Sequence, residues 1–269
     1  MKTIIAKKKY GQNFLKDESV LQQIIEAMPN NNNKIVEIGP GLGDLTKYLV
    51  DVKSVEAFEV DADLCKILQD SFDIAIKTNR LTLRCGDVLS TWKSNLLDEP
   101  YDLVANLPYY IATNIILKAL ADENCKNILV MVQLEVAQKF CASSGDSDFG
   151  ALSVIAQSIA NTKLIIKVPP TSFDPQPKVD SAVFLIEKKE SRKDEDFEKF
   201  LRVAFTQPRK TLLKNLSSTY NKERLIDTLK TLGVSQTIRP HELSTSDYHQ
   251  LYNNSRSLDA TRRNTTGDS

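Results

Sequence analysis

The feature that most constrains the fold is an uninterrupted alternation of short apolar strands and helical segments between residues 34 and 133. Strands are predicted at Lys34–Ile38, Ser54–Val60, Arg80–Cys85, Tyr101–Ala105 and Asn127–Gln133, with helical spacing between them, as in Leu42–Val50 and Ala62–Ser71. Repeated strand–helix units predict a parallel sheet covered on both faces by helices. We therefore expect an α/β fold that binds its ligand at the carboxyl ends of the strands.

The flanking segments extend this pattern and then change it. Asp17 is placed to cap a helix over Glu18–Met28. After a helical run at Ala151–Ser158, two further strands at Lys163–Val168 and Ser181–Glu187 are expected to close the sheet as a pair. From Lys188 onwards a charge-dense linker leads into segments with helical periodicity only. We expect one domain over residues 1–187 and a small helical domain over residues 188–269, with 258–269 disordered.

Composition and charge limit the class of protein. Apolar residues make up 41% and charged residues 26%, which is typical of an ordinary globular protein, and the 35 basic and 35 acidic residues cancel. The four cysteines lie far apart, without the spacing of a metal site, so we expect reduced thiols, no disulfide frame and no metal. The start MKTIIAKKK leaves no room for a secretion signal, and no apolar window reaches the ~20 residues that span a bilayer. A cytoplasmic protein is expected.

A glycine-rich turn follows the first strand, in VEIGPGLG over residues 36–43, and Glu59 ends the second strand. Glycines let the backbone approach a ligand closely, and an acid at that point can accept both hydroxyls of a ribose. A dinucleotide requires a third glycine and free N–H groups facing its pyrophosphate, but Asp44 occupies that glycine position and Pro40 removes an N–H. S-adenosylmethionine has a sulfonium cation and no phosphate. The turn favours that cofactor, with a nicotinamide dinucleotide as the alternative.

A second motif, Asn106-Leu107-Pro108-Tyr109, follows the strand Tyr101–Ala105. The Asn106 side chain offers an acceptor oxygen, Pro108 fixes the turn so that neighbouring carbonyls face the cleft, and Tyr109 supplies a ring for stacking. An exocyclic amino group on a purine has two N–H donors and a π face, which match these groups. The motif resembles that of amino-group methyltransferases, although a strand-ending turn with a packed tyrosine is an alternative reading.

Two further features bear on ligands. Asp87 follows the third strand beside a glycine, so it can accept from the adenine amino group of a cofactor, in register with Gly39, Glu59 and Asn106. Residues 1–16 carry five lysines and no acid, interrupted by aromatic residues, which suits contact with RNA phosphates and bases. The stretch 199–222 is also basic without an acid. Either basic stretch can instead be an ordinary solvated surface.

In this order, KKKYGQNFL, VEIGPGLG, EVD, GD and NLPY closely resemble the bacterial 16S ribosomal RNA adenine dimethyltransferase family, of the KsgA type. The resemblance continues through VPPTSF (168–173), PKVDSAV (177–183) and FTQPRKTLLKNL (205–216), so it covers nearly the whole chain. It implies a Rossmann-like class I methyltransferase sheet of seven strands, dependent on S-adenosylmethionine, with a small C-terminal helical domain that binds ribosomal RNA. It also implies successive dimethylation of N6 on two adjacent adenosines in the 3′-terminal hairpin loop of 16S RNA, during small-subunit assembly.

The resemblance also implies the site residues. Cofactor contacts fall on Asn13, Leu15, Gly39, Glu59, Asp87 and Asn106. The target base is expected between Tyr109 and Phe173, with its amino group held by the Asn106 side chain and the Leu107 carbonyl in the turn that Pro108 shapes. The alternative for Phe173, in its PPxxF turn, is a core anchor. Where the family commonly has Asn and then Ile-Ser-Thr after NLPY, this chain has Tyr110-Ile111-Ala112-Thr113, which changes the hydrogen bonding behind the pocket. We expect a monomer.

Three other functions are compatible with parts of the pattern. A 23S ribosomal RNA adenine methyltransferase of the antibiotic-resistance type shares the NLPY motif, but the balanced charge and the KTLLKNL helix favour the small-subunit enzyme. An assembly or transcription factor that keeps the fold without catalysis is disfavoured by the intact Asn106, Pro108 and Tyr109. A nicotinamide oxidoreductase is distinguished by whether NAD or S-adenosylmethionine raises the melting temperature.

Overall fold

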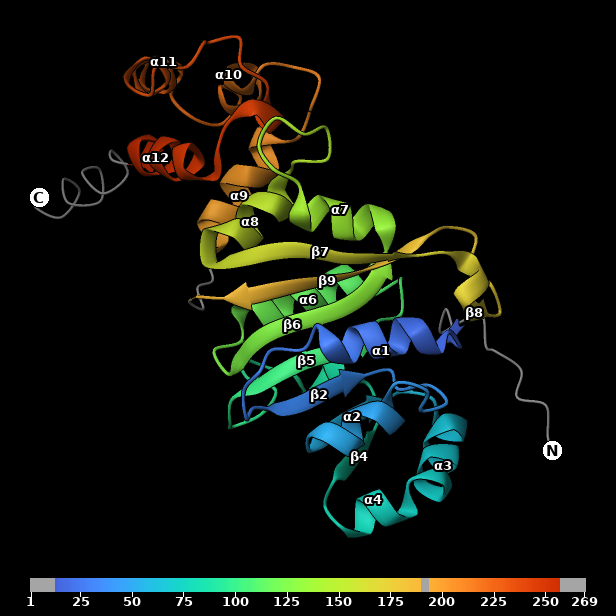
Figure 1. Ribbon diagram of the computed structural model, residues 1–269. Helices are drawn as coiled ribbons and strands as arrows, with labels where there is room; N and C mark the ends of the chain where they lie inside the picture. Colours follow the sequence, from blue (N-terminus) through green and yellow to red (C-terminus); the bar gives the residue numbers. More distant parts are fainter. Residues whose placement is uncertain (1–12, 190–193, 257–269) are drawn as a thin grey trace, which may run out of the picture. The chain divides into compact units, whose positions relative to one another are not determined.

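The computed structural model describes residues 13–189 and 194–256 (Figure 1). Most of the expected basic arm, residues 1–12, and the expected disordered tail, residues 258–269, lie outside the described residues. The chain divides into two compact units. The first runs up to Gln138 and resumes at Ala160, and the second takes Lys139–Ile159 together with the C-terminal stretch that begins at Lys193.

The division differs from the single boundary at 187/188 that the sequence suggests, because Lys139–Ile159 belongs to the helical unit. The reason lies in the packing of that segment. Phe149 and Val154 are buried in the same apolar cluster as Phe200, Leu216 and other residues of the C-terminal helices. Burial of these side chains, rather than their position along the chain, therefore decides to which unit the segment belongs.

The first unit is built on a seven-stranded sheet in the order β4-β3-β2-β5-β6-β9-β7. Its strands are β2 (Lys34–Ile38), β3 (Val55–Glu59), β4 (Leu81–Cys85), β5 (Tyr101–Asn106), β6 (Cys125–Gln133), β7 (Ala160–Val168) and β9 (Ser181–Lys188). β2 to β6 pair in parallel, as predicted, while β9 lies antiparallel between β6 and β7. The predicted closing pair is confirmed, and the sheet is mixed because β9 runs against its neighbours.

Helices cover both faces of this sheet. Figure 1 shows α1 in front of the strands and α6 behind them. The helices that begin within the unit are α1 (Glu18–Glu26), α2 (Thr46–Val52), α3 (Ala62–Ser71), α4 (Asp73–Lys77), α5 (Val88–Thr91), α6 (Ala112–Ala121) and α7 (Leu134–Cys141). The predicted cap of α1 is confirmed, since the Asp17 Oδ1 accepts from the backbone N–H of Ser19 at 3.0 Å. Buried strands at the sheet centre explain the near-continuous apolar runs in the sequence.

A separate two-stranded sheet was not predicted. β1 (Phe14–Leu15) pairs antiparallel with β8 (Phe173–Asp174), which follows the short helix η2 (Pro170–Ser172). Two contacts beside the strands strengthen the pair: the Lys16 N–H donates to the Ser172 carbonyl at 2.8 Å, and the Ser172 hydroxyl donates to Asp17 at 2.9 Å. Strands of two residues carry no periodicity that a sequence reading can detect.

The second unit is helical in its described part. It contains α8 (Ala151–Ile159), α9 (Glu195–Ala204), α10 (Leu212–Leu216), α11 (Lys222–Thr231), the short helix η3 (Pro240–Glu242) and α12 (Thr245–Arg256). Their apolar faces share one core rich in aromatic side chains, in which Phe197 contacts both Phe200 and Tyr252. The six basic residues of the stretch 199–222 are all exposed: Lys199, Arg202, Arg209, Lys210, Lys214 and Lys222.

The cysteines correct one expectation. Cys65 of α3 and Cys85 at the end of β4 form a disulfide across a Cα–Cα distance of 6.1 Å, although no disulfide was expected. The separation of 20 residues has no recognisable spacing signal, but α3 packs against β4 and brings the two side chains together. Cys125 is fully buried in β6. Within the described residues, no helix is long and apolar enough to cross a membrane.

Candidate active site

A cavity of about 200 Å³ lies at the carboxyl ends of the adjacent strands β4, β3, β2 and β5. Each strand supplies one of the residues singled out from the sequence: Asp87 follows β4, Glu59 ends β3, Gly39 follows β2 and Asn106 ends β5. All four line this one cavity because the strand order places the four ends side by side. Ligands of open α/β sheets bind at such strand ends, where the order reverses.

The glycine turn after β2 is packed too tightly for side chains. Gly39 has a φ of +72°, and a Cβ there would lie 3.3 Å from the Pro108 Cδ. Gly41 has a φ of +63°, and a Cβ there would lie 3.1 Å from the Phe14 ring. Residues other than glycine rarely adopt this backbone conformation. The turn therefore contacts both the NLPY segment and β1, which brings the two predicted binding motifs against each other.

The Glu59 carboxyl is held at the cavity by backbone hydrogen bonds. Its side chain is 4% exposed, and its two oxygens accept from the backbone N–H groups of Gly41 at 3.1 Å and Asp61 at 2.8 Å. Burial raises the pKa of the Glu59 carboxyl, while these two hydrogen bonds oppose that rise. A carboxylate has about four acceptor positions, so oxygens that each take one N–H can still accept from the hydroxyls of a ribose.

Asp87 begins the short helix α5. Its Oδ1 accepts from the Leu89 N–H at 2.9 Å, and the next residue, Val88, is buried at the cavity wall. The remaining acceptor positions of the carboxylate suit an amino group, and the valine provides an apolar surface for a flat ring. This arrangement matches the recognition of adenine that the sequence suggests.

The charges around the cavity discriminate between the two cofactor classes. Four acidic side chains, those of Glu37, Asp44, Glu59 and Asp87, line it, and among the described residues its lining contains no lysine, arginine or histidine. At one edge Lys16 forms an ion pair with Asp44 at 2.6 Å. A pyrophosphate would be repelled by the acidic side chains, and Lys16 is already paired with Asp44, whereas a sulfonium and an ammonium would be attracted. The residues present therefore fit S-adenosylmethionine and do not fit a dinucleotide.

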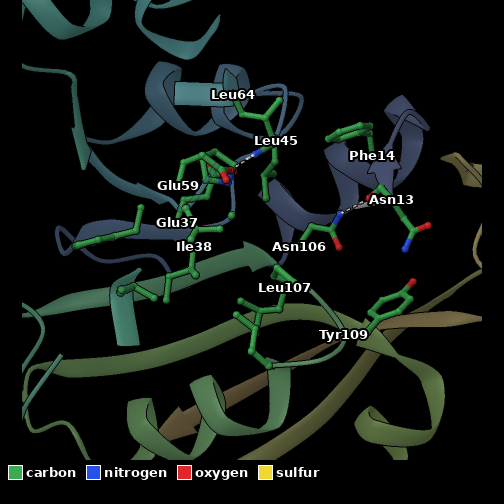
Figure 2. A pocket seen from close by; sticks show the side chains of 18 of the residues that line it. Asn13, Phe14, Glu37, Ile38, Leu45, Glu59, Leu64, Asn106, Leu107 and Tyr109 are labelled. Carbon is green, nitrogen blue, oxygen red and sulfur yellow. Dashed lines mark hydrogen bonds between the residues drawn. The ribbon is translucent and has the colours of Figure 1, made fainter. Parts of the chain in front are cut away.

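Asn106 is oriented by a partner distant in sequence. Its side-chain nitrogen donates to the Asn13 carbonyl oxygen at 3.3 Å, which leaves the side-chain oxygen as the acceptor of the amide. Figure 2 shows the nitrogen directed at Asn13 and the oxygen directed away from it. Leu107 is 1% exposed, and its N–H donates to the Met131 carbonyl at 3.0 Å, which ties the start of the motif to β6.

Tyr109 and Tyr110 both line the cavity beyond Pro108. Tyr109 is half-buried, burial raises the pKa of its phenol, and its hydroxyl lies 2.6 Å from the Ser181 hydroxyl. Tyr110, which stands where the family commonly has Asn, is 60% exposed. The turn is closed by a hydrogen bond from the Ile111 N–H to the Pro108 carbonyl at 3.2 Å.

The segment 13–15 lines the cavity, whereas Phe173 of the PPTSF segment does not. Asn13 and Leu15 line the cavity, as does Phe14, one of the aromatic residues within the basic stretch 1–16. Phe173 is 3% exposed and packs in the apolar core with Leu15 and Val168, and it is not part of the cavity lining. In this structure its ring is not open to a base beside Tyr109. The segment around Phe173 instead holds β1, and so Phe14 and Leu15, at the cavity.

Glu37 is a site residue that the sequence motifs do not single out. It is 1% exposed, lines the cavity, and accepts a hydrogen bond from the Thr46 hydroxyl at 2.7 Å. The signal was present in the sequence, because an acid interrupts the apolar strand two residues before Gly39. Burial raises the pKa of Glu37 to about 8, with a smaller contribution from the charge of Glu59.

This raised pKa predicts how stability depends on pH. Between the ordinary value of 4.5 and about 8, the folded protein keeps a proton that the unfolded chain releases, so stability falls as pH rises through that window. We expect Glu37→Gln to remove this slope, which for one group is at most about 1.4 kcal/mol per pH unit. Melting temperatures of the cofactor-free proteins at several pH values between 5 and 8.5 measure it.

The exposed Glu26 provides a matched control, since Glu26→Gln makes the same change outside the cavity. The melting temperature of Glu37→Gln, relative to that of the unmodified protein, should increase as pH rises. The relative melting temperature of Glu26→Gln should stay constant. A Glu37→Gln difference that is equal at every pH would contradict the prediction.

Comparisons with known proteins agree with this geometry. The family model described as ribosomal RNA adenine dimethylase matches residues 4–256. Ribosomal RNA small subunit methyltransferase A of Sulfurimonas denitrificans is 70% identical over 265 residues, which are 98% of this chain and 99% of that protein.

Two solved structures share the fold at 24% identity. A dimethyladenosine transferase from Plasmodium falciparum has a TM-score of 0.75 and covers 88% of this chain and 95% of its own. The 23S rRNA methyltransferase ErmE has a TM-score of 0.70 and covers 90% and 99%. At this level of identity the likeness establishes the Rossmann-like methyltransferase architecture.

Proposed function

The chain belongs to the ribosomal RNA adenine dimethylase family, and from this premise we propose that it methylates N6 of two adjacent adenosines in the 3′-terminal hairpin loop of 16S RNA. It is an S-adenosylmethionine-dependent ribosomal RNA adenine dimethyltransferase. The relative that shares 70% of its residues is named for the small ribosomal subunit, which favours 16S RNA over 23S RNA. We propose that the substrate is the immature small subunit in the cytoplasm and that the enzyme acts as a monomer.

The observation that carries the proposal is the orientation of Asn106. Because its nitrogen is engaged by the Asn13 carbonyl, its oxygen is the group that can accept from an adenine amino group. The Leu107 carbonyl is the second acceptor in the proposal, and Pro108 packs against Gly39 of the cofactor turn. Two acceptors would draw both N–H groups away from the ring plane, so that the nitrogen lone pair is no longer delocalised into the ring.

Bound S-adenosylmethionine supplies an electrophilic methyl group. The residues of the chain then act by position and charge. Glu59 and Asp87 are placed for the ribose and the adenine of the cofactor, and Asn106 directs the target amine towards it. An adenosine stacked in RNA cannot reach this site, so the target must be extruded, and stacking on Tyr109 returns ~1–3 kcal/mol. The proposal assigns stacking to Tyr109 alone, since Phe173 is in the core.

The test is mass spectrometry of ribosomal RNA from a strain that lacks the gene. We expect N6,N6-dimethyladenosine to disappear from the 3′-terminal hairpin of 16S RNA, and to return with the unmodified gene but not with Asn106→Ala. Purified enzyme should methylate immature small subunits from that strain. Loss of methylation in 23S RNA instead would support the resistance-type activity, and unchanged RNA together with a ribosome-assembly defect would support a non-catalytic factor.

A further inference from the structure

The Tyr109 hydroxyl is anchored to β9, an interior strand of the sheet that lies next to the edge strand β7. It lies 2.6 Å from the hydroxyl of Ser181, the first residue of β9. Ser181 is 0% exposed, and in the sheet it is aligned with Gln133 of β6 on one side and Val168 of β7 on the other. The turn that carries Tyr109 is thus linked through a side chain to a strand that is paired along both edges.

The hydrogen bond constrains one property of the Tyr109 ring. The phenol oxygen lies on the long axis of the ring, so a bond to it fixes the direction of that axis and leaves rotation about the axis free. A side chain on a turn otherwise has several staggered χ1 positions. The bond to Ser181 selects the χ1 position that places the ring at the cavity. Figure 2 shows the Tyr109 ring and the Asn106 side chain at the same pocket.

We propose that Ser181 is a positioning residue for methyl transfer, acting through Tyr109. This inference rests on the proposed function, in which the Tyr109 ring stacks on the extruded adenine. Ser181 does not touch the base. It holds the stacking surface in place, so that the amine bound at Asn106 stays aligned with the methyl donor. A small error in such alignment lowers the rate of the chemical step more than it weakens binding.

A double-mutant cycle tests the inference. Ser181→Ala removes the hydrogen bond by deleting the hydroxyl on the sheet. Tyr109→Phe removes it by deleting the hydroxyl on the turn and keeps the ring. We expect each to lower kcat about tenfold, the effect of losing one hydrogen bond, with the KM for RNA and the Kd for S-adenosylmethionine changed less than threefold. The double variant should be no slower than either single variant.

Two results would overturn it: an unchanged kcat in Tyr109→Phe, or a double variant whose loss is the product of the two single losses. Ser153→Ala is the matched control, because Ser153 is equally buried and its hydroxyl donates to the Lys139 carbonyl within the second unit. It should lose comparable thermal stability and keep its kcat. Tyr109→Ala tests the stacking role of Tyr109 separately from the positioning role of Ser181. An unchanged kcat in this variant would contradict the stacking role, whatever the effect of Ser181→Ala.

Discussion

Asn106→Ala should lower the kcat of methyl transfer by about 100- to 1000-fold, the effect of removing one preorganised hydrogen-bonding group at a reacting centre. The loss follows from the position of the amide oxygen, which in the proposal accepts from the target amine. The Kd for S-adenosylmethionine should change only a few fold, because Glu59, Asp87 and the glycine turn remain in place. Single-turnover methylation of immature small subunits and calorimetric titration of the cofactor measure the two quantities separately.

Two variants delimit this prediction. Asn106→Asp keeps an acceptor oxygen but cannot donate to the Asn13 carbonyl, so its kcat should fall between those of Asn106→Ala and the unmodified enzyme. Asn30→Ala makes the alanine change at an exposed asparagine outside the cavity and should leave both quantities unchanged. If Asn106→Ala turns over at the normal rate, the assigned role of the amide oxygen is wrong.

Glu59→Gln should weaken S-adenosylmethionine binding by about 30- to 1000-fold, or roughly 2–4 kcal/mol, since hydrogen bonds to a charged group are the stronger kind. The structure adds a second reason. Backbone N–H groups of Gly41 and Asp61 converge on the two carboxylate oxygens, so a glutamine must turn its own NH₂ towards one of these donors. The variant therefore loses a carboxylate and also disturbs the glycine turn that we propose contacts the cofactor.

Glu56→Gln is the matched control, because Glu56 lies on the same strand, is similarly buried and does not line the cavity. Glu56 forms ion pairs with Arg84 and Lys34, so its loss should affect stability without affecting cofactor affinity. Melting temperatures without cofactor distinguish a folding defect from a binding defect. A Kd in Glu59→Gln that matches the unmodified enzyme would remove Glu59 from the cofactor site.

Much of the fold could be predicted because periodicity and burial go together. The strands from Lys34 to Gln133 lie within a few residues of their predicted bounds, and α3 matches its predicted range, Ala62–Ser71. The convergence of Gly39, Glu59, Asp87 and Asn106 also followed from the sequence, since parallel strands present their carboxyl ends on one edge. The antiparallel placement of β9 and the assignment of Lys139–Ile159 to the helical unit did not follow, because both depend on non-local packing.

Contacts between distant segments account for the remaining differences. Cys65 and Cys85 join because α3 and β4 pack together, and no spacing in the chain announces it. The family resemblance predicts Phe173 beside the target base, with a core anchor as the alternative. Phe173 lies in the core because β8 pairs with β1, which turns the phenylalanine inward and holds Phe14 and Leu15 at the cavity.

The chemical groups at the strand ends could be read from the chain, because a strand–helix alternation with glycine, acid and amide at successive ends leaves few arrangements open. The directions of those groups depend on contacts that form only in the folded protein. The Asn106 amide is oriented by the carbonyl of Asn13, 93 residues away, and the Tyr109 ring by the hydroxyl of Ser181, 72 residues away. Local preference sets the type of each element, whereas the direction of a side chain is set by the partner that folding brings beside it.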